Sequence, residues 1–216
     1  MRRAAVALAL SLALAACAAE RSPPVVAVEP APEPVVKEWE DAATVADRDA
    51  IAALPERWRA ALAAVPRRGQ GRVRAEGPLA KPDAALEQPT PSPGPYYCRL
   101  LRFGGRVGVA TFRPDFCYVT VDDGRLTFTK QTGENLPQGR LYEDEPTRLV
   151  FLGTMGPGRY GEDPTRDVAG VVERVSPFRW RLTLTRAGRR SRLDLYELVP
   201  VTPEVPLAPR AIPARD

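Results

Sequence analysis

A period-two alternation of apolar and polar residues constrains the fold of this chain more than any other feature. The clearest run is 178–185, where Phe178 and Trp180 begin an apolar series that alternates with arginine and threonine. This pattern is typical of a half-buried β-strand. The same alternation occurs in 125–130, and no helical segment of 10–15 residues separates such runs, which disfavours a parallel α/β fold.

Turn residues separate the alternating runs at short intervals, for example at Asp123-Gly124 and Ser176-Pro177. We therefore expect about eight strands, at 96–103, 116–122, 125–130, 137–142, 147–153, 168–175, 178–185 and 192–199. Such a series predicts a mainly β fold, either a small antiparallel β-barrel or a strongly curled sheet. Five bulky residues are expected to fill its interior: Phe128, Phe151, Trp180, Leu182 and Leu184.

An N-terminal helical cap is predicted ahead of the strands. Thr44 and Asp47 have the spacing of a capping box, with Asp in place of the usual Glu. Apolar residues then recur at intervals of three and four, at Ile51, Leu54, Trp58, Ala61, Leu62 and Val65. Because Pro55 interrupts this pattern, we expect two short helices, about 44–54 and 55–65, with the apolar stripe packed on the sheet.

Two of the three cysteines, Cys98 and Cys117, lie in the first two predicted strands. A hairpin would place them opposite each other, and a disulfide is the usual state of such a pair in an oxidising compartment. A redox or metal-binding pair is the alternative, but the spacing is not CxxC and the chain contains no histidine.

The N-terminus has the features of a bacterial lipoprotein signal. Arg2 and Arg3 precede a short apolar run, which ends in Leu14-Ala15-Ala16-Cys17 and so matches a lipobox. Residues 1–16 are therefore predicted to be a signal peptide, and Cys17 the lipidated first residue of the mature protein. Ala18, in place of an aspartate, favours the outer membrane, with the protein facing the periplasm.

Proline content defines the ends of the folded region. Residues 17–36 and 201–216 are rich in proline, a composition that favours extended chain without a packed core. We expect a tether that extends from Cys17 through 17–36, a single folded domain at 37–200 with β region at about 96–199, and a disordered tail at 201–216.

The absence of histidine excludes several kinds of catalytic site. Ser-His-Asp triads, Cys-His nucleophile pairs and histidine-ligated metals cannot form, and no cofactor or metal is expected. Carboxylates remain, and the strongest candidates are Asp163 and Asp167, with Glu173 on the next strand. A simpler interpretation is that Asp163 starts a turn and Asp167 caps it or pairs with Arg166.

Two groups of residues are candidates for binding. A loop carries Tyr160, Asp163, Arg166 and Asp167, and a basic cluster near the last hairpin contains Arg186, Arg189, Arg190 and Arg192. The cluster either protects a sheet edge or docks an acidic protein, lipid headgroup or polysaccharide. Nucleic acid is not an expected partner, because the chain is predicted to be exported.

Several short motifs between Trp39 and Pro200 resemble a known family. They are Asp47-Arg48, Leu54-Pro55 with Trp58, Gly94 to Arg99, Thr132-Gly133, Gly139 to Tyr142, Leu149 to Thr154, Tyr160 to Pro164 with Arg166-Asp167, Gly170 to Arg174, Trp180 to Leu182 and Glu197 to Pro200. The chain resembles exported proteins of Gram-negative bacteria that are classified as a domain of unknown function, DUF4893. The resemblance implies a fold but no catalytic residues. The basic stretch 67–74 is longer than in the family pattern.

Three functions are compatible with these features. The preferred one is a non-enzymatic, membrane-anchored lipoprotein whose barrel docks an envelope protein, as an accessory factor or an inhibitor. The alternative is a lipocalin-like barrel that holds a small apolar ligand, which the bulky interior residues disfavour. The third is a hydrolase that uses carboxylates.

Overall fold

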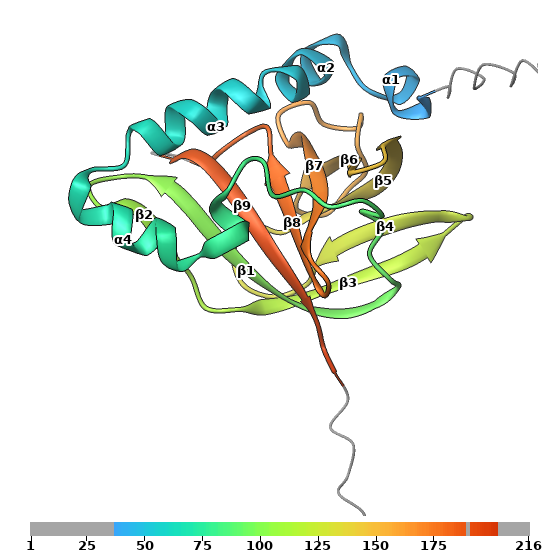
Figure 1. Ribbon diagram of the computed structural model, residues 1–216. Helices are drawn as coiled ribbons and strands as arrows, with labels where there is room; N and C mark the ends of the chain where they lie inside the picture. The colour runs from blue at the N-terminus through green and yellow to red at the C-terminus, as the bar shows by residue number, and fades with distance from the viewer. Residues whose placement is uncertain (1–36, 189–190, 203–216) are drawn as a thin grey trace, which may run out of the picture. The chain divides into compact units, whose positions relative to one another are not determined.

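The computed structural model describes residues 37–188 and 191–202. In this part of the chain, a series of short helices precedes a series of strands (Figure 1). The helices are α1 (Glu38–Ala42), α2 (Val45–Ala52), α3 (Leu54–Ala63), α4 (Arg67–Ala75) and the 3-10 helix η1 (Gly77–Ala80). The strands are β1 (Gly94–Gly104), β2 (Gly108–Thr111), β3 (Asp115–Asp122), β4 (Arg125–Lys130), β5 (Pro137–Glu145), β6 (Arg148–Met155), β7 (Asp167–Ser176), β8 (Arg179–Leu184) and β9 (Ser191–Pro200).

Eight of these strands close into an antiparallel barrel, which confirms the predicted fold class. The order β1-β3-β4-β5-β6-β7-β8-β9 follows the chain, and β9 pairs with β1 to complete the ring. The ninth strand, β2, forms a hairpin with the second half of β1 and is not among the predicted strands. At the β3–β4 turn, Asp123 and Gly124 have φ angles of 51° and 74°, the left-handed conformation that two-residue hairpins require.

Side chains fill the interior of the barrel. All five residues that were expected there are buried in one apolar cluster, together with Tyr96 and Tyr196. The rings of Phe128 and Phe151 meet edge to face, with centroids 6.2 Å apart. Because eight strands leave a space that side chains can just fill, the interior is a packed core.

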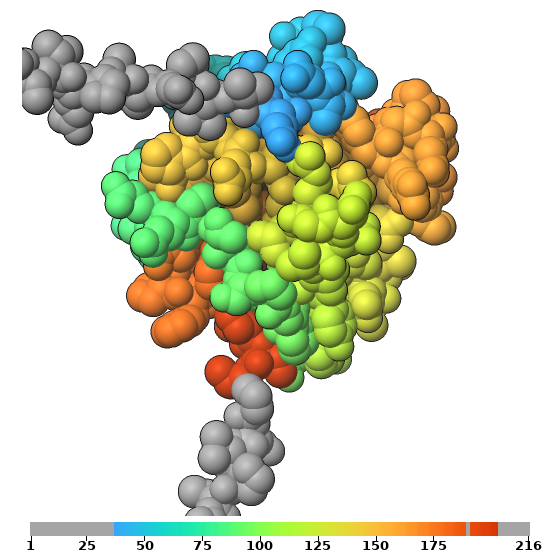
Figure 2. All heavy atoms as spheres, turned by 90° about the vertical axis from the view of Figure 1, so that its right-hand side faces the viewer, coloured from blue at the N-terminus to red at the C-terminus, as the bar shows by residue number. Residues whose placement is uncertain are grey.

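A second apolar core lies between the helices and the outer face of the barrel. It contains Trp39, Ile51, Leu54, Trp58 and Val65 from the helical segment, and Leu101, Val150, Leu152, Val171 and Leu195 from the strands. Figure 1 shows α2 and α3 along one side of the barrel, with β3 and β4 away from them. The predicted apolar stripe therefore packs on the sheet. None of the described helices covers the outer face of β3 and β4, which lies on the side of the molecule that Figure 2 turns toward the viewer.

Strand β8 differs from the predicted half-buried strand because its polar side chains are buried as well. Arg181, on the outer face, has no exposed surface. Its guanidinium group donates to Glu173 and to the carbonyl oxygens of Leu79 and Lys81, and it lies 4.9 Å from the ring of Trp58. These contacts satisfy a buried charge. Phe178, predicted to point inward, instead lies in the turn before β8 and is 75% exposed.

The helices confirm the predicted start of the cap and add three elements. Thr44 is the N-cap of α2, and its hydroxyl accepts a hydrogen bond from the amide of Asp47, at 3.1 Å. The break before Pro55 is also present, since α3 begins at Leu54. Helices α1, α4 and η1 are not among the predicted elements. Helix α4 contains the basic stretch 67–74.

The cysteine pair has a geometry compatible with the expected disulfide. Cys98 and Cys117 lie on the paired strands β1 and β3, with Cα atoms 5.9 Å apart and the sulfur atoms joined. The register places Asp115 opposite Cys98 and Tyr96 opposite Cys117. The two cysteines are therefore diagonal neighbours, two residues away from the directly opposite arrangement that was expected.

Several predictions lie outside the described residues. They are the signal peptide 1–16, the lipidated Cys17, the tether 17–36, and the tail 201–216 except for its first two residues. Within the described ranges, no helix is long and apolar enough to cross a membrane.

Candidate functional site

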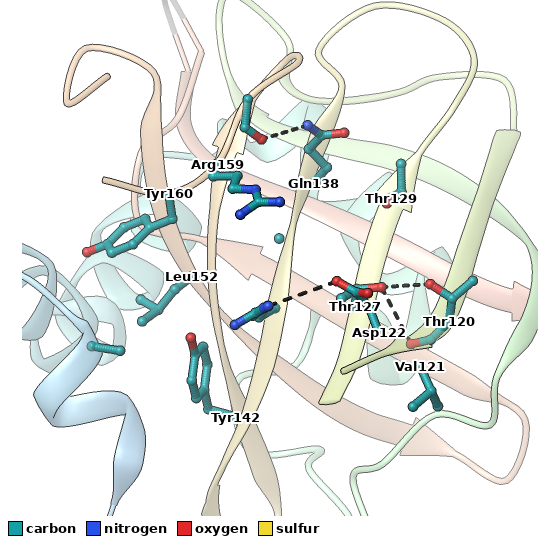
Figure 3. A pocket seen from close by; sticks show the side chains of 14 residues that line it. Thr120, Val121, Asp122, Thr127, Thr129, Gln138, Tyr142, Leu152, Arg159 and Tyr160 are labelled. Atoms are coloured by element: carbon teal, nitrogen blue, oxygen red, sulfur yellow. Dashed lines mark hydrogen bonds and ion pairs between the residues drawn. The ribbon is translucent and has the colours of Figure 1, made fainter. Parts of the chain in front are cut away.

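An open hollow of about 720 Å³ lies on the outer face of β3, β4 and β5 (Figure 3). The strand register explains its floor, since Thr120, Thr127 and Arg140 are successive cross-strand neighbours whose side chains share one face of the sheet. Ala42, at the end of α1, and three residues of the β6–β7 loop form the rest of the boundary. The hollow thus occupies the part of the barrel that the helices leave uncovered.

The two sides of the hollow differ in chemistry. Hydroxyl groups line one side, from Thr120, Thr127 and Thr129, and the first two are hydrogen-bonded at 2.7 Å. Figure 3 shows Tyr142, Tyr160 and Leu152 together on the opposite side. Leu152 is itself buried, so a molecule in the hollow would meet hydrogen-bonding groups on one side and the aromatic surface of Tyr142 and Tyr160 on the other.

Two arginines give the hollow an excess of positive charge. The guanidinium of Arg140 is 3.9 Å from the carboxylate of Asp122, too far for a direct hydrogen bond. The guanidinium of Arg159 makes no hydrogen bond or ion pair with the described residues, and Figure 3 shows it directed toward the middle of the hollow. Both groups therefore keep hydrogen-bond donors available to a bound molecule.

The predicted binding loop holds its own shape by internal hydrogen bonds. Asp163 accepts bonds from the backbone and hydroxyl of Thr165 and pairs with Arg166 at 2.9 Å. Arg166 also donates to the carbonyl of Pro157, and Asp167 accepts from the amide of Gly161. The local partner of Arg166 is thus Asp163, not Asp167. These contacts fix the loop that carries Arg159 and Tyr160 over the hollow.

Tyr160 connects this loop to the helical cap. Its hydroxyl donates to the carboxylate of Asp47 and accepts a hydrogen bond from the amide of Thr44, at 3.1 Å. Two effects raise the pKa of Tyr160 to about 12: burial, which is the larger, and the hydrogen bond to Asp47. The phenol is therefore neutral near pH 7 and acts as a fixed contact between the loop and α2.

The carboxylates considered for hydrolysis have structural partners. The bonds from Thr165 and Arg166 lower the pKa of Asp163 below its usual value. Glu173 is bound by Arg181 at 2.7 Å. One oxygen of Asp167, Oδ1, is buried with no hydrogen-bond partner among the described residues. In the described part of the chain, no three acidic or cysteine side chains are grouped as metal ligands.

A second hollow, of about 650 Å³, brings together two features that were predicted separately. It is lined by Asp167 of the binding loop, by Arg186 and Arg192 of the basic cluster, and by Asp47 and Arg57 of the helices. Arg186 is committed to backbone carbonyls, those of Thr165 and Asp167. Residues 189 and 190, the other two predicted arginines, lie outside the described residues.

An aromatic surface adjoins the first hollow on the outer face of the barrel. It consists of Tyr97, Phe116, Tyr118 and Val199, with exposed fractions of 45%, 41%, 36% and 37%. Tyr97 is opposite Phe116 on one side and Val199 on the other, and the two rings are 5.1 Å apart. Tyr118 and Thr120 follow each other on the outer face of β3, so the aromatic surface and the hollow are continuous.

Apart from Tyr160, which belongs to the predicted binding loop, the residues that line the hollow and the aromatic surface were not predicted as a site. Their period-two polarity is the pattern of any solvated strand face, and the enclosing elements, α1 and the β6–β7 loop, come from distant parts of the sequence. One signal was available: Phe116 and Tyr118 flank Cys117 at positions that the disulfide directs outward. Large aromatic residues at outward positions indicate a candidate interaction surface.

Comparison with known proteins places the chain in a family. No curated protein and no solved structure matches it significantly. The profile of a family described as a domain of unknown function (DUF4893) matches residues 39–198, a range that begins within α1, ends within β9 and includes the hollow. The chain therefore belongs to the DUF4893 family.

Proposed function

We propose that this protein is a lipid-anchored envelope protein whose barrel is a non-enzymatic module that docks a protein partner. The observation that supports the proposal best is the aromatic surface. Tyr and Phe are enriched at the centres of protein interfaces, and exposed patches of this kind mark interaction sites on soluble domains. The partner is expected to present an apolar side chain or strand to Tyr97 and Phe116.

The packed interior argues against the lipocalin-like alternative. Tyr96, Phe128, Phe151 and Tyr196 each have at most 1% of their surface exposed, and a ligand would have to displace them. Removing large aromatic side chains from a packed core costs about 3–5 kcal/mol each. A partner bound on the outside requires no such rearrangement.

A polar margin surrounds the aromatic surface, as is usual at protein interfaces. Thr129 is opposite Tyr118, and Arg99, which follows Tyr97 on the outer face of β1, forms ion pairs with Glu76 and Glu197 at 2.5 and 2.6 Å. These charged groups are already paired, so a partner does not have to neutralise them. The apolar contact at the centre is therefore expected to dominate the affinity.

Site-specific photo-crosslinking in the native envelope tests the docking surface. A photoreactive phenylalanine analogue at position 118 should give one discrete cross-linked protein, and the product should be lost when Tyr97→Ser and Phe116→Ser are added. The matched control carries the analogue at Val45, which is 65% exposed on α2. Equal products from both positions, or a product that survives the two serine substitutions, would contradict the proposal.

Native mass spectrometry of the full lipoprotein, extracted in mild detergent, separates the two binding functions. A stoichiometric second protein supports docking and identifies the partner. A reproducible adduct of small-molecule mass that persists when the aromatic surface is substituted would instead favour a ligand inside the barrel.

Membrane attachment through Cys17 is the other part of the proposal. Acyl chains on the mature N-terminus are sufficient for stable anchoring, so Cys17→Ala should move the protein from the membrane pellet to the soluble fraction. Fractionation of the envelope checks this result, with Cys17→Ala compared with Ala18→Ser, which keeps the lipidated residue. Retention of Cys17→Ala in the membrane would show that the anchor lies elsewhere.

A further inference from the structure

We infer that the hollow on β3, β4 and β5 binds an acidic sugar, a saccharide ring that carries a carboxylate. This inference goes beyond protein docking and rests on different residues. It starts from the combination seen in Figure 3, where hydroxyl groups, aromatic rings and two guanidinium groups with unused hydrogen-bond donors surround one open space.

The hydroxyl side of the hollow matches the polar edge of a sugar. Thr129 offers a hydroxyl that can donate and accept, and the hydrogen-bonded pair of Thr120 and Thr127 keeps one donor and further acceptor sites. Their positions are fixed by the register of two paired strands. Gln138 donates from Nε2 to the carbonyl of Gly158, at 2.9 Å, which orients its amide and leaves its Oε1 as an acceptor. Neighbouring hydroxyl groups on a saccharide ring are donors and acceptors of the same kind.

The opposite side matches the apolar face of a sugar ring. Tyr142 and Tyr160 present aromatic surface beside Leu152 (Figure 3), and aromatic rings bury the C–H groups of a saccharide while keeping a polar tip in water. The positions of both rings are fixed. Tyr142 stacks with Arg125, whose guanidinium lies 5.6 Å from the ring centroid, and the hydroxyl of Tyr160 is bonded to Asp47.

The charge of the lining selects an anionic sugar over a neutral one. Arg140 and Arg159 outnumber the one lining carboxylate, that of Asp122, whose side chain is 71% exposed at the rim. A guanidinium group binds a carboxylate through two parallel hydrogen bonds. Since neither arginine is saturated by the described residues, the structure offers this arrangement without breaking an existing strong ion pair.

The size of the hollow fits a short saccharide. Ligand sites commonly have volumes of about 300–1,000 Å³, and this hollow, of about 720 Å³, lies within that range. It is open along the sheet, so sugar units beyond the bound ring can extend into solvent. The site therefore suits one segment of a longer acidic polysaccharide as well as a free oligosaccharide.

The test is a titration of the full mature chain with trigalacturonate, monitored by NMR. We expect shifts at Thr127, Gln138 and Arg140, and weaker binding at high salt, because the charges are exposed. Maltotriose, a neutral trisaccharide, should bind at least about tenfold more weakly, since hydrogen bonds to charged groups are stronger than those between neutral groups. Equal binding of the two sugars, or no binding of trigalacturonate, would overturn the inference.

Variants separate the sugar site from a general effect of charge. Arg140→Gln and Arg159→Gln should each weaken trigalacturonate binding about tenfold, whereas Arg67→Gln, on exposed α4, should leave it unchanged. Arg159 is exposed on a loop, so its variant should fold normally even if Arg140→Gln does not. Loss of binding in the Arg67 variant to the same extent would show that net charge alone is responsible.

Two further arms make the outcome unambiguous. Inorganic phosphate should bind much more weakly than trigalacturonate, and equal affinity would show a simple anion site and contradict the inference. Tyr97→Ser with Phe116→Ser, which removes the aromatic surface, should leave sugar binding intact. Failure of protein docking and failure of sugar binding can therefore be distinguished.

Discussion

Asp144 shows how a single buried charge can attach a helix to the barrel. Its side chain has no exposed surface and binds Lys37 at 2.8 Å, Arg148 at 2.5 Å and the indole nitrogen of Trp39 at 2.9 Å. Burial by itself would raise the pKa of Asp144, but the bonds from Lys37, Arg148 and Trp39 lower it below the usual value. The charged form is therefore the one that the fold stabilises.

Asp144→Asn should lower the free energy of unfolding by about 1–3 kcal/mol at neutral pH, because it removes the buried carboxylate charge that binds the partly exposed Lys37 and Arg148. The lowered pKa means that this contribution is complete above the unfolded-state pKa of about 4 and is lost as the pH falls through the folded-state value. Urea unfolding at neutral and acidic pH checks this: the difference between wild type and variant should shrink in acid. The control is Asp122→Asn, at an exposed position, which should change the free energy of unfolding by about 0.5 kcal/mol or less. A pH-independent effect of Asp144→Asn would contradict the conclusion that the charged form of Asp144 stabilises the fold.

Tyr160→Phe removes the hydrogen bonds between the β6–β7 loop and α2 and should cost about 1 kcal/mol near pH 7. Because the folded-state pKa, about 12, lies above the usual value of about 10, the contribution is complete below pH 10 and declines as the pH rises toward 12. Unfolding at neutral and alkaline pH measures the decline. The control is Tyr97→Phe, because the hydroxyl of Tyr97 bonds to none of the described residues. A similar effect of both variants would contradict the role of Tyr160.

At the scale of elements, a pair of glycines allows β5 and β6 to approach closely inside the barrel. Gly139 is opposite Gly153 in the register. A Cβ atom at Gly153 would collide with the carbonyl oxygen of Gln138 and with the ring of Phe151. Glycine at such positions permits the tight bending that barrel closure needs.

Gly153→Ala should therefore destabilise the protein by about 1–3 kcal/mol, the usual cost of overpacking a core. Gly71→Ala is the matched control, since Gly71 is exposed on α4 and an added Cβ would meet only the end of the Arg74 side chain, at 3.9 Å. Helix propensity predicts a gain of up to about 1 kcal/mol there. Thermal unfolding of both variants measures the difference. Two variants of equal stability would show that the strands adjust to the added methyl group.

Most strands could be predicted from sequence because turn residues separate them and because some, such as β4, alternate in polarity. Strand β2 could not, since four residues after Gly104-Gly105 are too few to show a period. Helix α4 has two glycines, which lower helix propensity, and too few apolar residues to show a helical period. It packs near β2. The polarity of β8 was misleading, because Arg181 and Thr183 alternate like solvated residues but are covered by segments far away in the chain.

The candidate site was predictable only in part, for the same reason. Tyr160, Asp163, Arg166 and Asp167 were predicted together as a binding loop, and the internal turn at Asp163 follows from its sequence. The hollow itself depends on which face of β3, β4 and β5 remains without a helix. That is decided by the docking of α1 through Asp144 and Trp39, a contact between residues about a hundred positions apart.

At the scale of the whole molecule, the disulfide joins the first two strands of the barrel. It closes a loop with a sequence separation of 19, for which chain entropy predicts a stabilisation of about 3 kcal/mol. Replacing Cys98 and Cys117 together by alanine should lower the unfolding free energy by about that amount, measured by urea unfolding without reductant. Wild type with reductant should match the variant, and a variant as stable as the oxidised wild type would contradict the prediction.

The pairing of β9 with β1 has a consequence for how the chain matures. Nine residue pairs join the two strands, from Tyr96 with Pro200 to Gly104 with Ser191. One long edge of β1 therefore stays unpaired until β9 has been synthesised and can pair with it. An unpaired edge of this kind readily joins other chains. The newly made protein should accordingly be at greatest risk of aggregation just before its last ten folded residues arrive, and truncations within β9 should accumulate as insoluble or degraded chains rather than as smaller folded domains.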